Sequence, residues 1–314
     1  MPDPSSRPFR FGVQLSGPAD AAAWVEQARK IEDLGYATVS MPDHFTDQLA
    51  PMPALAAVAA VTSTLRIGAL VFDNDYKHPV VLAKELATMD VLSGGRVEIG
   101  IGAGWMATDY HAAGIPYDRP GVRIDRFEEA LAVIKGALAD GPFSFGGTHY
   151  TITDYDGHPS PMQRPHPPIL IGGGGKRVLS IAAREADIIG INGNMAAGVV
   201  GPEAIATMTY EAVAERVALV REVAAERIDD IELNIRAFFL SVTDDRAARL
   251  TQVAGFISVE DSMIDTSPFA LIGSTSEIID QLVRRREELG FSYVIVGGDD
   301  VEPFAPVVAQ LAGR

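Results

Sequence analysis

The chain has 314 residues, 47% of them hydrophobic and 22% charged, and its 26 basic and 42 acidic residues give a net charge of −16 at pH 7. This acidic balance argues against a nucleic-acid-binding protein, which needs a basic face. The absence of cysteine excludes disulfides, thiolate metal sites and cysteine nucleophiles, and it is consistent with a cytoplasmic location.

The N-terminal residues, MPDPSSRPFR, lack the apolar stretch of a signal peptide, so residues 1–8 are expected to form a flexible leader. No uncharged apolar run reaches the ~18 residues of a transmembrane span. We therefore expect no membrane partner, and we expect residues 9–314 to form a single domain.

Short apolar segments alternate along the chain with stretches of helical periodicity. The expected strands are residues 9–15, 37–41, 65–71, 97–102, 168–172, 187–191, 232–242 and 292–297. The expected helices are residues 20–34, 53–62, 79–92, 123–139, 176–185, 203–226, 275–289 and 302–312. This alternation predicts an α/β fold, the (β/α)8 TIM barrel. An open doubly wound sheet is the alternative, but the first strand–helix turn, SGPAD, lacks a dinucleotide-binding fingerprint.

Three connections are too long for simple loops: residues 105–122 after strand 4, 140–167 before strand 5 and 243–274 after strand 7. The second contains FSFGGTHYTI, which predicts a hairpin around Gly146 and Gly147. Topology places the first and third insertions at the C-terminal face of the barrel, where barrel enzymes have their active sites. We expect these two to build the substrate pocket, and the second to lie at the opposite face.

A run of four glycines, Gly172, Gly173, Gly174 and Gly175, leaves strand 5 and opens a helix at Lys176. Without Cβ atoms a ligand can approach the backbone, and a helix N-terminus offers free N–H groups to an anion. Lys176 and Arg177 add positive charge. The run therefore predicts a phosphate site, and a tight strand–helix turn is the alternative.

Other polar or small residues follow strands 2 and 4. Asp43 and His44 could form an acid–base pair, because histidine titrates near neutral pH; a helix-capping Asp beside a hydrogen-bonded His is the alternative. Gly102 and Gly104 leave room for a flat ligand, and Trp105 could line the pocket or pack the insertion onto the barrel rim.

Several kinds of site are not expected. The remaining histidines have no partner at metal-binding spacing, so we predict no metal site. The chain contains no G-x-S-x-G elbow and no Walker loop. Arg96, in LSGGR before strand 4, is expected at the bottom of the barrel, where it would hold a structural ion pair.

Four segments resemble the bacterial luciferase-like superfamily of flavin and deazaflavin oxidoreductases. They are GYATVSMPDHF (35–45), TSTLRIGALV (62–71), HPVVLAKELATMDVLSGGRVEIGIGAGW (78–105) and PHPPILIGGGGKRVLSIAAREADIIGIN (165–192). The resemblance implies a (β/α)8 barrel, often dimeric, with the cofactor ring at the C-terminal face and its phosphate at the strand 5 glycines. It also implies a non-prolyl cis peptide near Leu70 and Val71.

The Asp-His pair after strand 2 is similar to that of the deazaflavin-dependent sugar-phosphate dehydrogenases. In that branch the histidine transfers a proton and the aspartate contacts the cofactor, which implies these roles for His44 and Asp43. The branch has a catalytic Glu where this chain has Trp105, and this departure argues against a sugar-phosphate substrate.

Together these features predict an oxidoreductase that uses the deazaflavin coenzyme F-420 to transfer hydride to or from a small organic substrate, as a homodimer. The alternatives are a monooxygenase that uses reduced FMN and a non-catalytic flavin-binding barrel. His44 is the predicted catalytic residue. The residues predicted to bind the cofactor are Asp43, Leu70, Val71, Gly102, Gly104, Trp105, Gly172, Gly173, Gly174, Gly175, Lys176 and Arg177.

Overall fold

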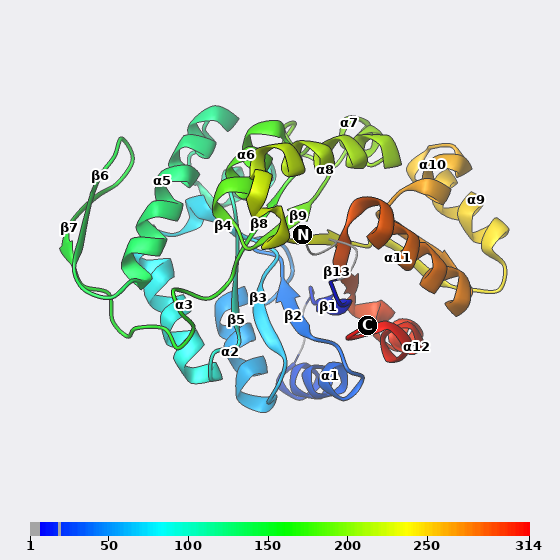
Figure 1. The fold of residues 1–314 in the computed structure, drawn as a ribbon, viewed down its shortest axis with the longest axis horizontal. Helices are drawn as coiled ribbons and strands as arrows, with labels where there is room; N and C mark the ends of the chain where they lie inside the picture. Colours follow the sequence, from blue (N-terminus) through cyan, green and yellow to red (C-terminus); the bar gives the residue numbers. More distant parts are fainter. Residues whose placement is uncertain (1–6, 18–19) are drawn as a thin grey trace.

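Eight parallel strands close into a barrel in the computed structural model, which describes residues 7–17 and 20–314 (Figure 1). In barrel order they are β1 (Arg10–Gln14), β2 (Thr38–Met41), β3 (Arg66–Ala69), β5 (Val97–Gly102), β8 (Ile169–Gly173), β9 (Ile188–Ile191), β10 (Glu232–Arg236) and β13 (Phe291–Gly297). The barrel closes where β13 pairs with β1, and the short β4 (Phe72–Asp73) pairs with the end of β5. The predicted TIM barrel is therefore confirmed.

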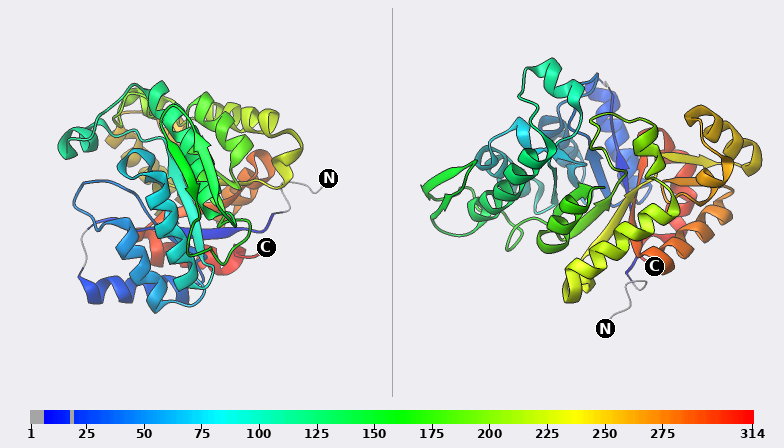
Figure 2. Two further views of the ribbon diagram at one scale, coloured as in Figure 1. Left: turned by 90° about the vertical axis from the view of Figure 1, so that its left-hand side faces the viewer. Right: turned by 90° about the horizontal axis from the view of Figure 1, so that it is seen from above.

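Helices surround this barrel, as the views in Figure 2 show. The main ones are α1 (Ala21–Asp33), α2 (Pro51–Val61), α3 (Pro79–Ser93), α5 (Pro120–Leu138), α6 (Lys176–Glu185), α8 (Tyr210–Ala224), α11 (Thr275–Leu289) and α12 (Val301–Leu311). Asp20 caps α1 by accepting a hydrogen bond from the backbone N–H of Ala23. The predicted single helix at 203–226 is wrong, because the Thr209 side chain accepts a hydrogen bond from Ala212 N and so begins α8 after the short α7 (Pro202–Ala206).

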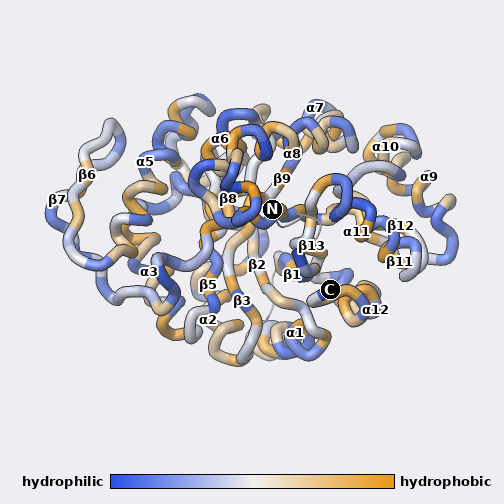
Figure 3. The backbone as a smooth tube through the Cα atoms, viewed as in Figure 1, coloured by the Kyte–Doolittle hydropathy of each residue, from blue (hydrophilic) through white to orange (hydrophobic). Residues whose placement is uncertain are grey.

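The core forms where the strands meet the inner faces of these helices. Every residue of β2 and β5 is buried, because parallel strands in a barrel are covered on both faces. The inner face of α1 buries Trp24, Ala28 and Ile31, which recur at spacings of three and four residues. Coloured by hydropathy, α12 is among the more apolar outer helices (Figure 3). Of the leader expected at 1–8, only Arg7 and Pro8 belong to the described residues.

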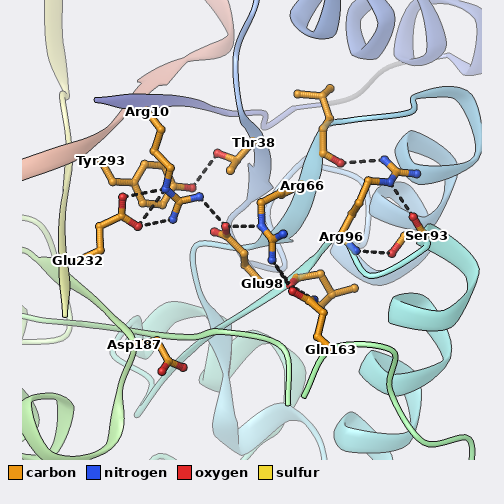
Figure 4. Close-up of polar contacts among 12 residues, drawn as sticks. Arg10, Thr38, Arg66, Ser93, Arg96, Glu98, Gln163, Asp187, Glu232 and Tyr293 are labelled. Atoms are coloured by element: carbon orange, nitrogen blue, oxygen red, sulfur yellow. Dashed lines mark hydrogen bonds and ion pairs between the residues drawn. The ribbon is translucent and has the colours of Figure 1, made fainter. Parts of the chain in front are cut away.

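A polar network fills the bottom of the barrel (Figure 4). Arg10 binds the Glu232 carboxylate through Nε (2.9 Å) and Nη2 (2.6 Å) and binds Glu98 Oε1 through Nη1 (2.5 Å). Arg66 Nε contacts the same Glu98 oxygen at 2.8 Å. The Arg10 guanidinium lies over the ring of Tyr293, 3.7 Å from its centroid. Side chains from β1, β3, β5, β10 and β13 are thus tied together.

Arg96 also lies at this end of the barrel, but the predicted ion pair is wrong. Its guanidinium donates to the backbone carbonyls of Ala59, Leu65 and Ser93 and to Thr62 Oγ1, and no carboxylate among the described residues lies within 4 Å. The cation thus binds backbone carbonyls at the C-terminal ends of α2 and α3, where a positive charge is favourable, and one in the loop before β3.

The insertion at 140–167 contains the predicted hairpin, with β6 (Phe143–Gly146) antiparallel to β7 (Thr151–Tyr155). The hairpin extends along the outside of α5 (Figure 1), where the Glu129 carboxylate accepts backbone hydrogen bonds from its tip. The rest of the insertion reaches the bottom of the barrel, where buried Asp90 accepts from the backbone N–H of Met162 and Gln163. The expected placement at the opposite face holds for this later part, whereas the hairpin lies on the side.

The strand expected at 232–242 is interrupted. β10 ends at Arg236, and β11 (Phe239–Val242) leaves the barrel and pairs with β12 (Ala270–Gly273). Helices α9 (Arg246–Ile257) and α10 (Asp261–Thr266) pack on this pair around a small core of their own, on the side opposite the hairpin (Figure 1). Among the described helices, none combines the length and the apolar character that a membrane crossing requires.

Candidate functional site

A pocket opens at the C-terminal ends of the barrel strands. Its lining includes Gln14, Asp43, His44, Leu70, Val71, Asp73, Tyr76, Gly102, Gly104, Trp105, Arg123, Gly172, Gly173, Gly174, Gly175, Asn192, Asn194, Asn234, Arg236 and Phe238. Every residue predicted for the site is among them except Lys176 and Arg177. The insertion 105–122 contributes walls as expected, but no residue of 243–274 lines the pocket, because that segment packs outside the barrel.

One wall of the pocket is formed by Leu70 and Val71, directly after β3, and is called the apolar shelf below. The Leu70–Val71 peptide is cis, as the resemblance implied. Gln14 Nε2 donates to the carbonyl of Leu70 at 3.1 Å. A Cβ at Gly102 would lie 2.8 Å from Val71 Cγ2, and one at Gly172 would lie 3.4 Å from Val71 Cγ1. The two glycines therefore leave Val71 free of neighbouring side chains on these sides, and a flat ligand can reach it.

The glycine run forms a second wall. A Cβ at Gly174 would lie 2.2 Å from the carbonyl oxygen of Gly193, so this glycine is required by the close approach of two backbones. Gly175 is different: it caps α6, and nothing lies within 4 Å of its Cβ position. The first turn of α6 follows it, with free N–H groups suited to an anion. The run thus combines a tight turn at Gly174 with an uncrowded helix N-terminus at Gly175.

The cations that line the pocket are not the ones predicted from the sequence. Arg177 pairs with Asp125 on α5 and donates to the carbonyl of Gly121, and neither it nor the exposed Lys176 lines the pocket. Arg123, in the first turns of α5, does line it. The Arg123 side chain is buried beneath Tyr117, with 4.2 Å between the guanidinium carbon and the ring centroid, and its Nε has no partner among the described residues.

His44 lines the pocket, and its imidazole ring is held by a contact with Asp109. Its Nδ1 lies 2.6 Å from Oδ2 of Asp109, which belongs to α4 (Ala107–Ala113) in the first long insertion. The Asp109 side chain is 5% exposed and the His44 side chain 20% exposed. The His44 and Trp105 rings pack edge to face, with their centroids 5.7 Å apart. The imidazole is thus fixed by a buried carboxylate and an indole.

Further carboxylates surround this pair. Burial raises the pKa of Asp73 to about 7. The backbone N–H of Asp75 donates to Asp73 and lowers this pKa, whereas the negative charge of the Asp75 carboxylate raises it further. The Tyr110 hydroxyl lies 3.0 Å from both Asp73 and Asp75. Because a hydroxyl has one hydrogen, a proton held by Asp73 near neutral pH satisfies the second contact.

Asp43 does not cap a helix. Its Oδ2 accepts the backbone N–H of Asp73 at 3.2 Å, and burial raises its pKa.

Gly104 is required by this cluster. It has φ +74°, and a Cβ there would lie 1.9 Å from the Tyr110 hydroxyl and 2.6 Å from Asp73 Oδ2. Any side chain at this position would displace the hydroxyl from the two carboxylates. The glycine therefore serves packing inside the rim, beside its place in the pocket lining.

Two functional candidates were missed from the sequence. Arg236 lines the pocket at the end of β10, donates to Gln14 Oε1 at 3.1 Å, and has its pKa lowered to about 10 by burial, against the opposing effect of Asp300. The expectation of one strand at 232–242 places Arg236 in the middle of that strand. With the strand ending at residue 236, Arg236 would have been a candidate at the C-terminal face of the barrel. Asp109 carries no signal, since no spacing relates it to His44.

Metal binding finds no support in the geometry. Within residues 7–17 and 20–314, no group of three or more His, Asp or Glu side chains is arranged to hold a metal ion.

Comparison with known proteins identifies the family. The luciferase-like monooxygenase family model matches residues 5–268. The chain is 30% identical over 222 residues to an FMNH2-dependent dimethylsulfone monooxygenase of Pseudomonas putida, covering 71% of this chain and 55% of that protein. The corresponding protein of Pseudomonas fluorescens is 28% identical over 193 residues, covering 62% and 48%. The chain thus matches about half the length of these relatives.

Solved structures share the fold. The coenzyme F420-dependent tetrahydromethanopterin reductase of Methanopyrus kandleri superposes with a TM-score of 0.78 at 19% identity, covering 97% of this chain and all of that one. The long-chain alkane monooxygenase LadA gives 0.77 at 15% identity, covering 98% and 91%. With the family model matching most of its length and the barrel pocket in place, the chain belongs to the luciferase-like monooxygenase family.

Proposed function

We propose that the protein is a coenzyme F-420-dependent oxidoreductase that transfers hydride to or from a small organic substrate. One observation carries this proposal: His44, fixed by Asp109, faces the same pocket as the apolar shelf at Val71. Such an arrangement can move a proton beside a flat redox ring. Two F420-dependent enzymes, the reductase described above and a secondary alcohol dehydrogenase with a TM-score of 0.75, support the proposal through their shared fold.

The residues present fit a flavin-type cofactor. Leu70, Val71, Gly102 and Gly172 would hold the ring, because the glycines leave the shelf clear. The backbone at Gly174 and Gly175, together with Arg123, which lines the same pocket, would hold the phosphate. When bound, the deazaflavin supplies or accepts the hydride.

His44 would give a proton to the substrate oxygen in the reductive direction and take it back in the oxidative one. Asp43, which lines the pocket near His44, would contact the cofactor. Trp105 would exclude water from the space between them.

A reduced-FMN-dependent monooxygenase is the second candidate. It is favoured by the relative in Pseudomonas putida, which is named as an FMNH2-dependent enzyme. The third reading, a non-catalytic flavin-binding barrel, would not need an imidazole fixed by a buried carboxylate at the pocket rim. The geometry therefore favours catalysis over storage.

The cofactor can be tested by titrating the protein with coenzyme F-420 and with FMN, each oxidised and reduced, and following fluorescence. We expect F-420 to bind more tightly. Equal affinity, or a tenfold preference for FMN (~1.4 kcal/mol), would overturn the deazaflavin assignment. Binding of neither compound would overturn the proposed function as a whole.

Gly175→Val tests the phosphate site without disturbing the fold. The valine Cβ has no atom within 4 Å, and the φ of −91° at this residue is open to any side chain. We expect cofactor affinity to fall at least ~10-fold, about 1.4 kcal/mol, because the side chain occupies the approach to the backbone. Calorimetric binding and thermal melting measure the two effects.

A matched control is Gly255→Val on α9, where the Cβ position is also open and the residue does not line the pocket. Gly173→Val is less informative, because its Cβ would lie 2.6 Å from Val178. If Gly175→Val binds cofactor as the wild type does, the glycines are only turn residues.

We also propose that the protein forms a homodimer through α2 and α3. Helix α2, with the sequence PMPALAAVAAV, has no charged side chain and exposes Pro53, Ala56, Ala57 and Ala60. The neighbouring α3 exposes Leu92, at 78%. Ala57→Arg should convert the dimer into monomers in sedimentation experiments, since a guanidinium would be buried unpaired. A wild-type monomer, or an unchanged dimer in the variant, would contradict this interface.

A further inference from the structure

We infer that Asp109 is a positioning residue for His44. Its carboxylate fixes the imidazole in the tautomer that carries hydrogen on Nδ1, so that Nε2 exchanges the proton in the pocket. The consequence for turnover rests on the role of His44 proposed above, whereas the contact itself does not.

The contact is short and sheltered. His44 Nδ1 and Asp109 Oδ2 are 2.6 Å apart, at least as short as charge-assisted N–H···O hydrogen bonds usually are. Asp109 lies in the first turn of α4, where the helix dipole favours a negative charge, and it is 4% exposed. Asp109 does not line the pocket, whereas His44 does. The carboxylate can therefore act on a bound ligand only through the ring.

The carboxylate determines which nitrogen holds the hydrogen. An ionised carboxylate only accepts hydrogen bonds, so Nδ1 must donate. A neutral imidazole has one N–H and one lone pair, which leaves the lone pair on Nε2. In the protonated ring the same carboxylate stabilises the positive charge. Without Asp109 the imidazole could hold its hydrogen on Nε2, with the lone pair turned away from the substrate.

The other carboxylates near His44 are engaged elsewhere. Asp43 accepts the backbone N–H of Asp73, and Asp73 is hydrogen-bonded to the Tyr110 hydroxyl and accepts the backbone N–H of Asp75. The Tyr76 hydroxyl lies 3.5 Å from the same Oδ2 of Asp109 and gives that oxygen a second donor. Among the described residues, Asp109 is thus the one carboxylate in contact with the ring.

The tautomer can be read directly by NMR of protein labelled with nitrogen-15 at histidine. The chain has six histidines, and loss of a signal in His44→Asn assigns the His44 ring. We expect the neutral ring of the wild type to carry hydrogen on Nδ1, and Asp109→Asn to lose this preference, since an amide can also donate to Nδ1. Asp118→Asn, which contacts Arg126 instead, should leave the pattern unchanged. Hydrogen on Nε2 in the wild type, or an unchanged tautomer in Asp109→Asn, would overturn the inference.

A double-mutant cycle tests the consequence for turnover, measured as oxidation of reduced F-420 by the best acceptor among small carbonyl compounds. We expect Asp109→Asn to lower turnover at least ~10-fold in the wild type and less than ~2-fold in the His44→Asn background, because residues that act as a unit are not additive. Equal losses in both backgrounds would overturn action through the ring. If the tautomer changes as expected but neither variant alters turnover, the positioning stands and the proposed function of His44 fails.

Discussion

Arg10→Met should lower the free energy of unfolding by about 3–5 kcal/mol, the range found when one partner of a buried ion pair is removed. The variant leaves Glu232 without a cation and leaves Glu98 with Arg66 alone. The Glu98 and Glu232 side chains are only 7% and 12% exposed, so water replaces the guanidinium poorly. Chemical denaturation at pH 7 measures the loss.

Two controls separate this buried network from charge in general. Arg164→Met removes an exposed pair with Asp140 and should cost less than ~1 kcal/mol. The double variant Arg10→Met/Glu232→Leu should be more stable than Arg10→Met, because it removes the stranded charge as well. If the double variant loses the sum of the two single effects, the network contributes through packing on Tyr293 and not through charge.

Much of the barrel could be predicted because its determinants are local. Each strand is a short apolar run, and caps such as Asp20 mark helix starts with a side chain that the sequence shows. The end of β10 could not be predicted in this way. Ala237 and Phe238 continue the apolar run beyond Arg236, and pairing of β11 with β12, some thirty residues later, ends the strand. This pairing is a tertiary contact between distant segments, so the local sequence pattern does not show where β10 ends.

The site residues likewise fall into those that local sequence places and those that tertiary packing places. Asp43, His44, Val71 and the glycines follow strand ends, so the topology alone brings them to one face. The pairing of Asp109 with His44 depends on where α4 packs. The charge beside the glycine run was misplaced for a similar reason: Asp125 on α5 engages Arg177, and Arg123 from the same helix lines the pocket instead.

His44→Asn should lower turnover at least ~10²-fold, about 2.7 kcal/mol, with little change in cofactor affinity. Hydride transfer to a carbonyl or enone leaves negative charge on the substrate, and general acid help of this kind contributes typically 10²–10⁴-fold. Asparagine keeps a hydrogen-bonding side chain but cannot exchange a proton near neutral pH. Turnover of reduced F-420 with the best carbonyl acceptor, together with cofactor titration, measures both quantities.

Asp43→Ala provides the contrasting case. Asp43 lines the pocket and is proposed to touch the cofactor, so its loss should weaken cofactor binding more than it slows turnover at saturating cofactor. Removing its carboxylate also frees the backbone N–H of Asp73, so melting curves must show that the variant is folded. Opposite effects of the two variants on affinity and rate would separate binding from proton transfer.

Wild-type turnover in His44→Asn would remove the imidazole from the reaction. The proton donor would then have to be Asn192, Asn194, Trp105, a residue of the insertions, water, or Asp73, which lines the same pocket and has its pKa raised to about 7 by burial. Neither amides nor indole exchange protons readily near neutral pH, so Asp73 or water would be left as the main sources, and a rate that still depends on pH in His44→Asn would indicate Asp73. A rate that falls in His44→Asn and depends on pH only in the wild type assigns the proton to His44, because Nε2 is the ring atom that Asp109 leaves free.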